Sequence, residues 1–162
     1  ARRARAFGMT IAYSNRKPVA AAIEAELDAT FMSMEELLAT SDVVSINCPY
    51  SPATHHLIGE AELAAMQPTA FLVNTARGPI VDEAALVAAL QAGSIAGAGL
   101  DVFEHEPAVH PGLLECEHAV LVPHLGSATI ETRAAMARLA AHNAVNVLSG
   151  LDPLTPIPVP AS

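Results

Sequence analysis

Short apolar runs alternate with Ala-, Leu- and Glu-rich segments along most of this sequence, and this alternation constrains the fold more than any other feature. Strands separated by helical segments are typical of βαβ units, in which neighbouring strands run parallel. Most of the runs are almost continuously apolar, so we expect helices to cover both faces of the sheet. The fold class is therefore α/β, a doubly wound parallel sheet. The predicted strands are Thr10–Tyr13, Ala29–Met32, Val43–Asn47, Ala70–Asn74, Gly97–Val102 and Ala119–Val122.

Capping signals mark where helices begin between these strands. Ser33, followed by an acid three residues later, forms a capping box for the helical segment Glu35–Ala39. Asp82 is placed to cap a helix over Glu83–Ala92. The longest predicted helix spans about Ile130–Leu148, and its apolar residues recur at helical spacing. We expect that apolar stripe to pack against the sheet.

The composition limits the kind of protein that this chain can be. Its 162 residues are 52% hydrophobic, which supports a folded domain, and 17 acids against 8 bases give a net charge of −9, which argues against nucleic acid as a partner. No apolar run approaches the roughly 18 residues of a membrane span. Two cysteines, Cys48 and Cys116, show neither a disulfide framework nor metal-ligand spacing. We therefore expect a soluble, cytoplasmic protein that does not bind membranes.

Polar residues follow most of the predicted strands, at the edge where ligands bind in open parallel sheets. Because the carboxyl ends of parallel strands meet at one edge, this convergence is a stronger signal than any single motif. It predicts a functional site there. The polar sets are Ser14-Asn15-Arg16-Lys17, Cys48-Pro49, Thr75-Ala76-Arg77-Gly78, Asp101 with Glu104 and Glu106, and Pro123-His124-Leu125-Gly126-Ser127.

Three segments of the chain closely resemble signature segments of the D-isomer-specific 2-hydroxyacid dehydrogenases, and the glyoxylate/hydroxypyruvate reductase branch is nearest. The resemblance covers nearly the whole chain and implies a Rossmann-like nucleotide-binding domain. It also implies an oxidoreductase that transfers a hydride between a nicotinamide cofactor and a small 2-oxo or D-2-hydroxy acid, and a homodimer. The segments are Asn74-Thr75-Ala76-Arg77-Gly78, Gly99-Leu100-Asp101-Val102-Phe103-Glu104-His105-Glu106-Pro107 and Pro123-His124-Leu125-Gly126-Ser127-Ala128-Thr129.

The resemblance assigns the catalytic roles to Arg77, Glu106 and His124. A His that titrates near neutrality suits proton donation to a carbonyl oxygen, and a carboxylate beside it orients the ring. Arg77 has the planar fork that binds a carboxylate through two hydrogen bonds. Taken singly, each residue has a plainer interpretation: a structural loop histidine, a surface arginine beside a turn, and an exposed acid.

The resemblance also implies a set of cofactor contacts. Cys48 and Pro49 would line the adenine side, the backbone around Thr75 and Ala76 would meet the nicotinamide ribose or amide, and Asp101 would accept a hydrogen bond from the carboxamide. Asp101 has a competing interpretation as a strand-end residue bonded to backbone amides. Further implied contacts are Thr54 and Gly126.

The residues after the first predicted strand indicate which cofactor is preferred. NAD-binding relatives place an acid there to bind the ribose hydroxyls, but this chain has Ser14. We therefore predict NADP(H), with Arg16 as the main partner of the 2′-phosphate and Asn15 as a donor; the alternative is an exposed basic turn. The pair His55-His56 has no Cys, Asp or Glu at ligand spacing, so we predict a loop edge or helix start and no metal site.

The family's Gly-rich loop, G-x-G-x-x-G, does not occur in the sequence. The segment Ala1–Gly8 resembles the second half of the helix that follows this loop, so we expect the chain to begin inside a domain. In this interpretation residues 1–150 form a partial NAD(P)-binding domain that lacks its first strand and Gly-rich loop. Residues 151–162 form an extended tail that leads back toward an absent substrate domain.

The missing strand would lie between the strands Thr10–Tyr13 and Val43–Asn47 in a doubly wound sheet. Those two strands must then either separate or close up. We expect the chain on its own to be catalytically silent and marginally stable. Two alternatives remain for the parent protein: another enzyme of the superfamily, of which formate dehydrogenase fits less well because it has Gln where Glu106 stands, or a nucleotide-sensing, corepressor-like interaction module.

Overall fold

The computed structural model describes residues 1–157, which fall into two compact units. The first unit spans residues 1–123 and contains all the strands, and the second begins at His124.

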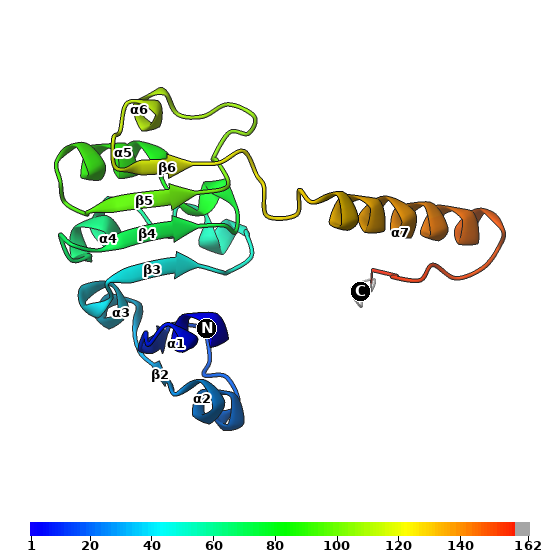
Figure 1. Ribbon diagram of the computed structural model, residues 1–162, viewed down its shortest axis with the longest axis horizontal. Coiled ribbons are helices and arrows are strands. Elements are labelled where there is room, and N and C mark those ends of the chain that lie inside the picture. Colours follow the sequence, from blue (N-terminus) through cyan, green and yellow to red (C-terminus); the bar gives the residue numbers. More distant parts are fainter. Residues whose placement is uncertain (158–162) are drawn as a thin grey trace. The chain divides into compact units, whose positions relative to one another are not determined.

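Six parallel strands form two sheets in the first unit (Figure 1). The predicted strands are all confirmed, with ends that differ from the prediction by at most two residues. Register aligns Val43 with Phe71 and Phe71 with Gly97, so the carboxyl ends of the larger sheet lie at one edge. The smaller sheet pairs β1 (Ile11–Tyr13) with β2 (Ala29–Phe31), and the larger has the order β3 (Val43–Ile46), β4 (Phe71–Asn74), β5 (Gly97–Leu100), β6 (Ala119–Leu121).

The strands β1 and β3 lie in different sheets. The sequence predicts that these two either separate or close up, and separation is what the structure shows. The neighbour relations within each sheet are those of a doubly wound fold. Within each of the two sheets, the strand order is therefore the one expected for a doubly wound fold.

Helices follow the strands as predicted, and the two predicted caps are formed. Ser33 Oγ accepts a hydrogen bond from the Glu36 amide at 3.1 Å, while Glu36 Oε2 accepts one from the Ser33 amide at 3.0 Å. Asp82 Oδ1 accepts from the Ala85 amide at 3.0 Å. The helices are α1 (Arg2–Ala6), α2 (Ala21–Leu27), α3 (Met34–Thr40), α4 (Glu60–Ala65), α5 (Glu83–Gln91) and α6 (Pro111–Leu114), with 3-10 turns η1 (Pro52–Thr54) and η2 (Gly78–Ile80).

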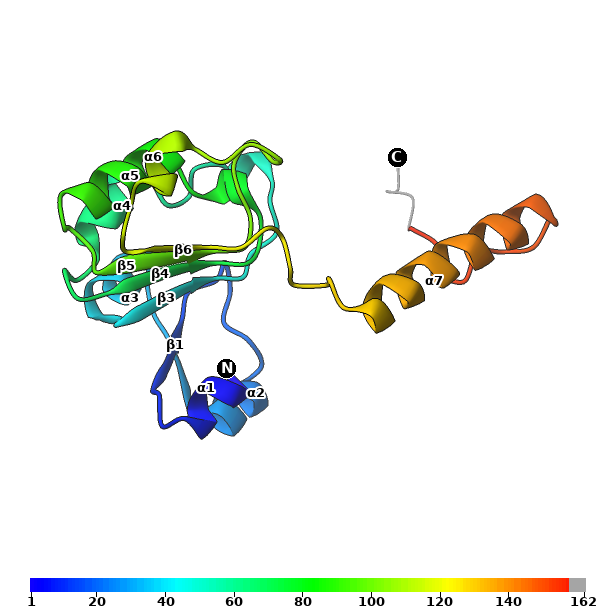
Figure 2. The ribbon, with the colours of Figure 1, turned by 45° about the horizontal axis from the view of Figure 1, so that its top comes forward.

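The core of the first unit lies between the larger sheet and a row of helices. Neighbours in the series α3, α4, α5, α6 contact one another, and Figure 2 shows α4 to α6 over one face of the sheet. The apolar runs predict that both faces of most strands are buried, and this prediction is wrong for β3 and β4. Their residues alternate, with Val44 and Leu72 buried but Val43 and Phe71 exposed. Other core side chains include Leu38, Ile58, Leu63, Ile80, Leu86 and Leu113.

The second unit begins at His124 and contains α7 (Ile130–Leu148) with the segments before and after it. The helix has the predicted bounds and begins at Thr129, whose Oγ1 accepts from the Thr132 amide at 3.1 Å. None of its described residues is buried. The Asn143 side chain accepts from the Leu154 amide at 2.7 Å. Residues 158–162 of the predicted tail lie outside the described residues. Among residues 1–157, no helix is both long and apolar enough to cross a membrane.

Candidate functional site

An open pocket of about 640 Å³ lies at the carboxyl ends of β3 and β4. It forms there because adjacent parallel strands deliver their following loops to the same edge of the sheet. Five predicted site residues come together in its lining: Cys48, Pro49, Thr75, Ala76 and Arg77. Its other lining residues are Ile46, Asn47 and Tyr50.

The turn that carries Arg77 is shaped by Asn74, which the sequence marks only as the end of a predicted strand and the first residue of a motif. Asn74 is 1% exposed. Its Oδ1 accepts from the Ala76 amide and its Nδ2 donates to the Arg77 carbonyl oxygen, both at 3.0 Å. The Asn74 carbonyl oxygen accepts from the Asp101 amide at 3.0 Å. One buried side chain therefore fixes the backbone on the β4 side of the pocket.

Arg77 is exposed and lines the pocket. One guanidinium nitrogen, Nη1, donates to the Ala76 carbonyl oxygen at 2.5 Å. The guanidinium has five N–H donors in a rigid fork, a geometry that matches a carboxylate. Arg77 is therefore suited to bind an anionic group that enters the pocket.

The segment after Arg77 packs directly on the segment that carries Glu106. A Cβ added to Gly78 would lie 1.9 Å from the carbonyl carbon of Phe103, so only glycine permits this approach. Glu106 is exposed, and its Oε1 accepts from the Phe103 amide at 3.0 Å. Asp101, at the end of β5, is buried. The backbones that carry two of the predicted catalytic residues are thus in contact.

The loop after β1 holds the residues predicted to choose the cofactor. Ser14 is half-buried, whereas Asn15, Arg16 and Lys17 are exposed. The Tyr13 hydroxyl donates to Glu24 Oε1 at 2.6 Å and accepts from the Val19 amide at 2.9 Å, which closes the base of the loop. Partial withdrawal from water, and then the hydrogen bond to the Glu24 carboxylate, raise the pKa of Tyr13.

Thr54 lies in η1 and holds the loop that lines the pocket after β3. Its Oγ1 donates to the Pro49 carbonyl oxygen at 2.9 Å and accepts from the Ser51 amide at 2.8 Å. His124 and Gly126 belong to the second unit. His124 has a left-handed backbone with φ of 53°, which is uncommon for a residue with a side chain and often marks a functional loop.

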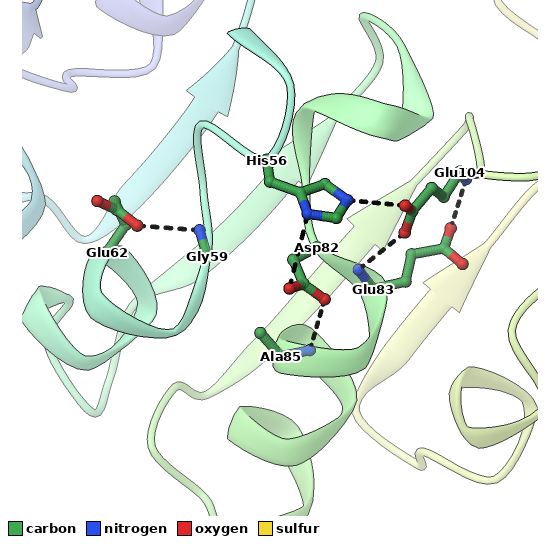
Figure 3. Close-up of polar contacts among 7 residues, drawn as sticks. All are labelled: His56, Gly59, Glu62, Asp82, Glu83, Ala85 and Glu104. Atoms are coloured by element: carbon green, nitrogen blue, oxygen red, sulfur yellow. Dashed lines mark hydrogen bonds and ion pairs between the residues drawn. The ribbon is translucent and has the colours of Figure 1, made fainter.

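Figure 3 shows a hydrogen-bonded cluster around His56 that was not predicted from the sequence. His56 Nε2 lies 2.7 Å from Glu104 Oε1, and His56 Nδ1 lies 3.7 Å from Asp82 Oδ2. The contact joins residues 48 positions apart, so no local pattern signals it. In the part of the chain that the structure describes, no group of three or more His, Cys, Asp or Glu is placed to hold a metal ion.

The residues of the pocket and of the basic loop fit parts of a phosphorylated dinucleotide. The pocket lies within the range of roughly 300–1,000 Å³ that is usual for small-molecule sites, and backbone and hydroxyl groups line it. Exposed Arg16 and Lys17 offer the cations that a phosphate requires.

Comparison with known proteins matches residues 1–126 to the model of the "D-isomer specific 2-hydroxyacid dehydrogenase, NAD binding domain". A glyoxylate reductase of Thermococcus onnurineus is 50% identical over 157 residues, which are 96% of this chain and 46% of that relative. The chain thus spans about half the length of the curated relatives it matches.

Solved structures show the same likeness. A glyoxylate reductase from Paecilomyes thermophila has a TM-score of 0.85 and 47% identity, covering 97% of this chain and 47% of that one. An NADPH-dependent glyoxylate/hydroxypyruvate reductase from Sinorhizobium meliloti, in complex with NADP and malonate, has a TM-score of 0.87 and 40% identity. That match covers 96% of this chain and 48% of the other.

Proposed function

The chain belongs to the D-isomer-specific 2-hydroxyacid dehydrogenase family through its NAD-binding domain, and on this premise we propose that it serves a reductase of small 2-oxo acids. The reaction transfers a hydride between NADP(H) and a 2-oxo/D-2-hydroxy acid pair, with glyoxylate or hydroxypyruvate as the substrate. Relatives named for these activities support the choice of substrate.

The observation that carries the proposal is the pocket at the ends of β3 and β4. It combines nucleotide-sized space, the Cys48–Pro49 and Thr75–Ala76 backbones, and the guanidinium of Arg77. A cation at one end of a cofactor pocket supports binding of a substrate carboxylate beside the reactive end of the cofactor.

Three residues perform the chemistry in this proposal. Arg77 binds the substrate carboxylate and helps to polarise the neighbouring carbonyl. His124 donates a proton to the carbonyl oxygen during reduction and accepts it in the reverse direction. Glu106 holds the imidazole of His124 and orients its ring. The bound nicotinamide supplies or accepts the hydride.

The remaining residues bind the cofactor. We assign the adenine side to Cys48 and Pro49, with Thr54 shaping their loop, and the nicotinamide side to Thr75, Ala76, Asp101 and Gly126. Ser14, Asn15 and Arg16 bind the adenosine ribose and its 2′-phosphate. The exposure of Asn15 and Arg16, together with Ser14 where an acid would repel phosphate, supports a preference for NADP(H) over NAD(H).

We further propose that the 162-residue chain by itself does not turn over substrate. The diphosphate of a dinucleotide binds at the first strand of a doubly wound sheet, and the neighbours of that position, β1 and β3, lie in different sheets here. The family resemblance supports a cytoplasmic homodimer as the working form.

Turnover tests the proposal. The intact gene product should oxidise NADPH when glyoxylate or hydroxypyruvate is added, with a higher kcat/KM than for NADH. Binding of NADPH without turnover of any small 2-oxo acid would instead favour a nucleotide-sensing interaction module. The isolated chain serves as the comparison, and hydride transfer by it would contradict the proposed inactivity.

A further inference from the structure

We propose that His56 is a positioning residue that holds the backbone segments of Arg77 and Glu106 against each other. The inference rests on the proposed roles of these two residues. It concerns a histidine outside the pocket that touches neither the substrate nor the cofactor.

The backbone of His56 is attached to the segment that follows Arg77. The His56 amide donates to the Pro79 carbonyl oxygen at 2.9 Å, and the Ile58 amide donates to that of Ile80 at 3.1 Å. The Asp82 amide returns a hydrogen bond to the Ile58 carbonyl oxygen at 3.0 Å. Residues 56–58 therefore run alongside residues 79–82, beginning two residues after Arg77.

The side chain of His56 is attached to the other segment. Its Nε2 lies 2.7 Å from Glu104 Oε1, two residues before Glu106, and the Glu104 side chain is 16% exposed. The Glu104 amide donates to Glu83 Oε1 at 2.8 Å, and the Glu83 amide donates to Glu104 Oε2 at 3.4 Å. Figure 3 shows this imidazole between Glu104 on one side and Asp82 on the other.

Charge explains why the imidazole matters in this cluster. Asp82, Glu83 and Glu104 bring three carboxyl groups together, and Glu83 is 4% exposed. Carboxylates accept hydrogen bonds but do not donate them, so the cluster needs donors to offset their withdrawal from water. His56 supplies a ring donor that reaches across to Glu104.

The two attached segments carry the catalytic groups on either side of one close backbone contact. Gly78 adjoins Arg77 and packs on Phe103 and Glu104, whose backbone leaves no space for a Cβ. The Phe103 amide in turn donates to the Glu106 carboxylate at 3.0 Å. If Glu104 is displaced, the neighbouring Phe103 amide, which binds the Glu106 carboxylate, therefore moves relative to Arg77.

Two substitutions separate positioning from folding. His56 has a left-handed backbone with φ of 49°, a conformation that Asn tolerates well. His56→Asn keeps this backbone but is too short to reach Glu104, whereas His56→Gln places an amide N–H near the position of Nε2. His142→Asn, at an exposed position of α7, is the matched control.

In the intact gene product, His56→Asn should lower kcat for the 2-oxo acid about tenfold, because misplaced catalytic groups lose transition-state contacts. The dissociation constant of NADPH should stay within about twofold, because no cofactor contact is removed. His56→Gln should recover most of the lost kcat. Equal kcat values for wild type and His56→Asn, or equal loss in both His56 variants, would overturn the inference.

Amide hydrogen exchange on the intact gene product tests the same inference without any measurement of activity. His56→Asn should accelerate exchange of the Phe103 and Glu104 amides about tenfold, and His56→Gln and His142→Asn should not. The Ala98 amide, bonded to the His118 carbonyl oxygen in the sheet, is the internal reference. If the wild-type gene product reduces no 2-oxo acid, the proposed function fails, and unchanged exchange at Phe103 and Glu104 would separately refute the positioning role.

Discussion

The side-chain Nδ2 of Asn74 lies 3.0 Å from the carbonyl oxygen of Arg77, so a buried amide at the end of β4 supports the residue that lines the pocket. The same side chain binds the Ala76 amide through Oδ1. The backbone shape of this side of the pocket thus depends on one residue that does not itself reach the solvent.

We predict that Asn74→Leu destabilises the protein. The substitution leaves the part-buried Ala76 amide and Arg77 carbonyl without their partner, at a cost of about 1–2 kcal/mol for each group. Chemical denaturation should therefore show a loss of about 2–4 kcal/mol. Asn47→Leu, at the exposed end of β3, should change stability by less than about 0.5 kcal/mol. Similar losses for both variants would contradict this account of Asn74.

Gly78→Ala tests the close contact between the segments of Arg77 and Glu106. The added Cβ would lie 1.9 Å from the Phe103 carbonyl oxygen and 2.4 Å from the Glu104 nitrogen, both backbone atoms. We expect a loss of about 3 kcal/mol, the upper range for overpacking. Gly99→Ala is the control, since its Cβ would meet Val73 Cγ2 at 4.0 Å. A wild-type denaturation midpoint for Gly78→Ala would show that these segments are not in contact.

The base of the cofactor loop should respond to pH. Tyr13 and Tyr50 are the two tyrosines of the chain, so tyrosinate absorbance in a Tyr50→Phe background reports Tyr13 alone. Its pKa is raised above the usual value of 10.0, first by withdrawal from water and second by the Glu24 carboxylate. The neutral phenol is favoured in the folded state. This contribution to stability is therefore complete below the ordinary pKa and is lost as pH rises through the raised one.

Glu24→Gln should lower the pKa of Tyr13 toward its ordinary value, because a neutral amide accepts a hydrogen bond from the phenol less strongly than a carboxylate does. The absorbance titration measures this shift directly. An identical titration curve in the Glu24→Gln variant would show that the carboxylate does not contribute.

Arg16→Ala should reduce the preference of the intact gene product for NADPH. Loss of a charge-assisted contact to the 2′-phosphate should raise the KM for NADPH about tenfold, with little effect on NADH, which has no such phosphate. Lys17→Ala, which removes a neighbouring exposed cation, should have a smaller effect. Equal effects of Arg16→Ala on both cofactors would reject the assignment.

His124→Gln and Arg77→Lys should produce different kinetic defects. Loss of the general acid should lower kcat by about a thousandfold. Arg77→Lys keeps the charge but removes the fork, so the KM of the 2-oxo acid should rise about tenfold or more. Binding of NADPH, followed by fluorescence titration, should change little in both variants. Retention of wild-type kcat by His124→Gln would exclude it as the proton donor.

The sequence allowed accurate prediction of local structure where local signals dominate. Apolar runs between helical segments located each strand of residues 1–157, and the Ser33 capping box and the Asp82 cap located two helix starts. Prediction of burial was less accurate. The apolar character of β3 and β4 suggested two covered faces, but Val43 and Phe71 are exposed, because burial depends on which elements pack on a face.

The candidate site also has a part that the sequence predicted and a part that it did not. Motif order and strand ends identified Cys48, Pro49, Thr75, Ala76 and Arg77, because residues that follow adjacent parallel strands must meet at one edge. The support beneath them was not predictable. Glu104 follows a predicted strand and Glu83 begins a predicted helix, but no local signal pairs them, because the hydrogen bond between them joins segments 21 residues apart.

The sequence by itself determined the family, the order of the strands and the identity of the groups that can do chemistry, because these follow from residue type and spacing. Only the tertiary structure decided which groups support others. Hydrogen bonds between residues far apart in the chain, such as that between His56 and Glu104, form only after packing brings their atoms within 3 Å. The separation of β1 from β3 also depends on the tertiary structure, because a parallel strand pairs only with a strand that lies beside it.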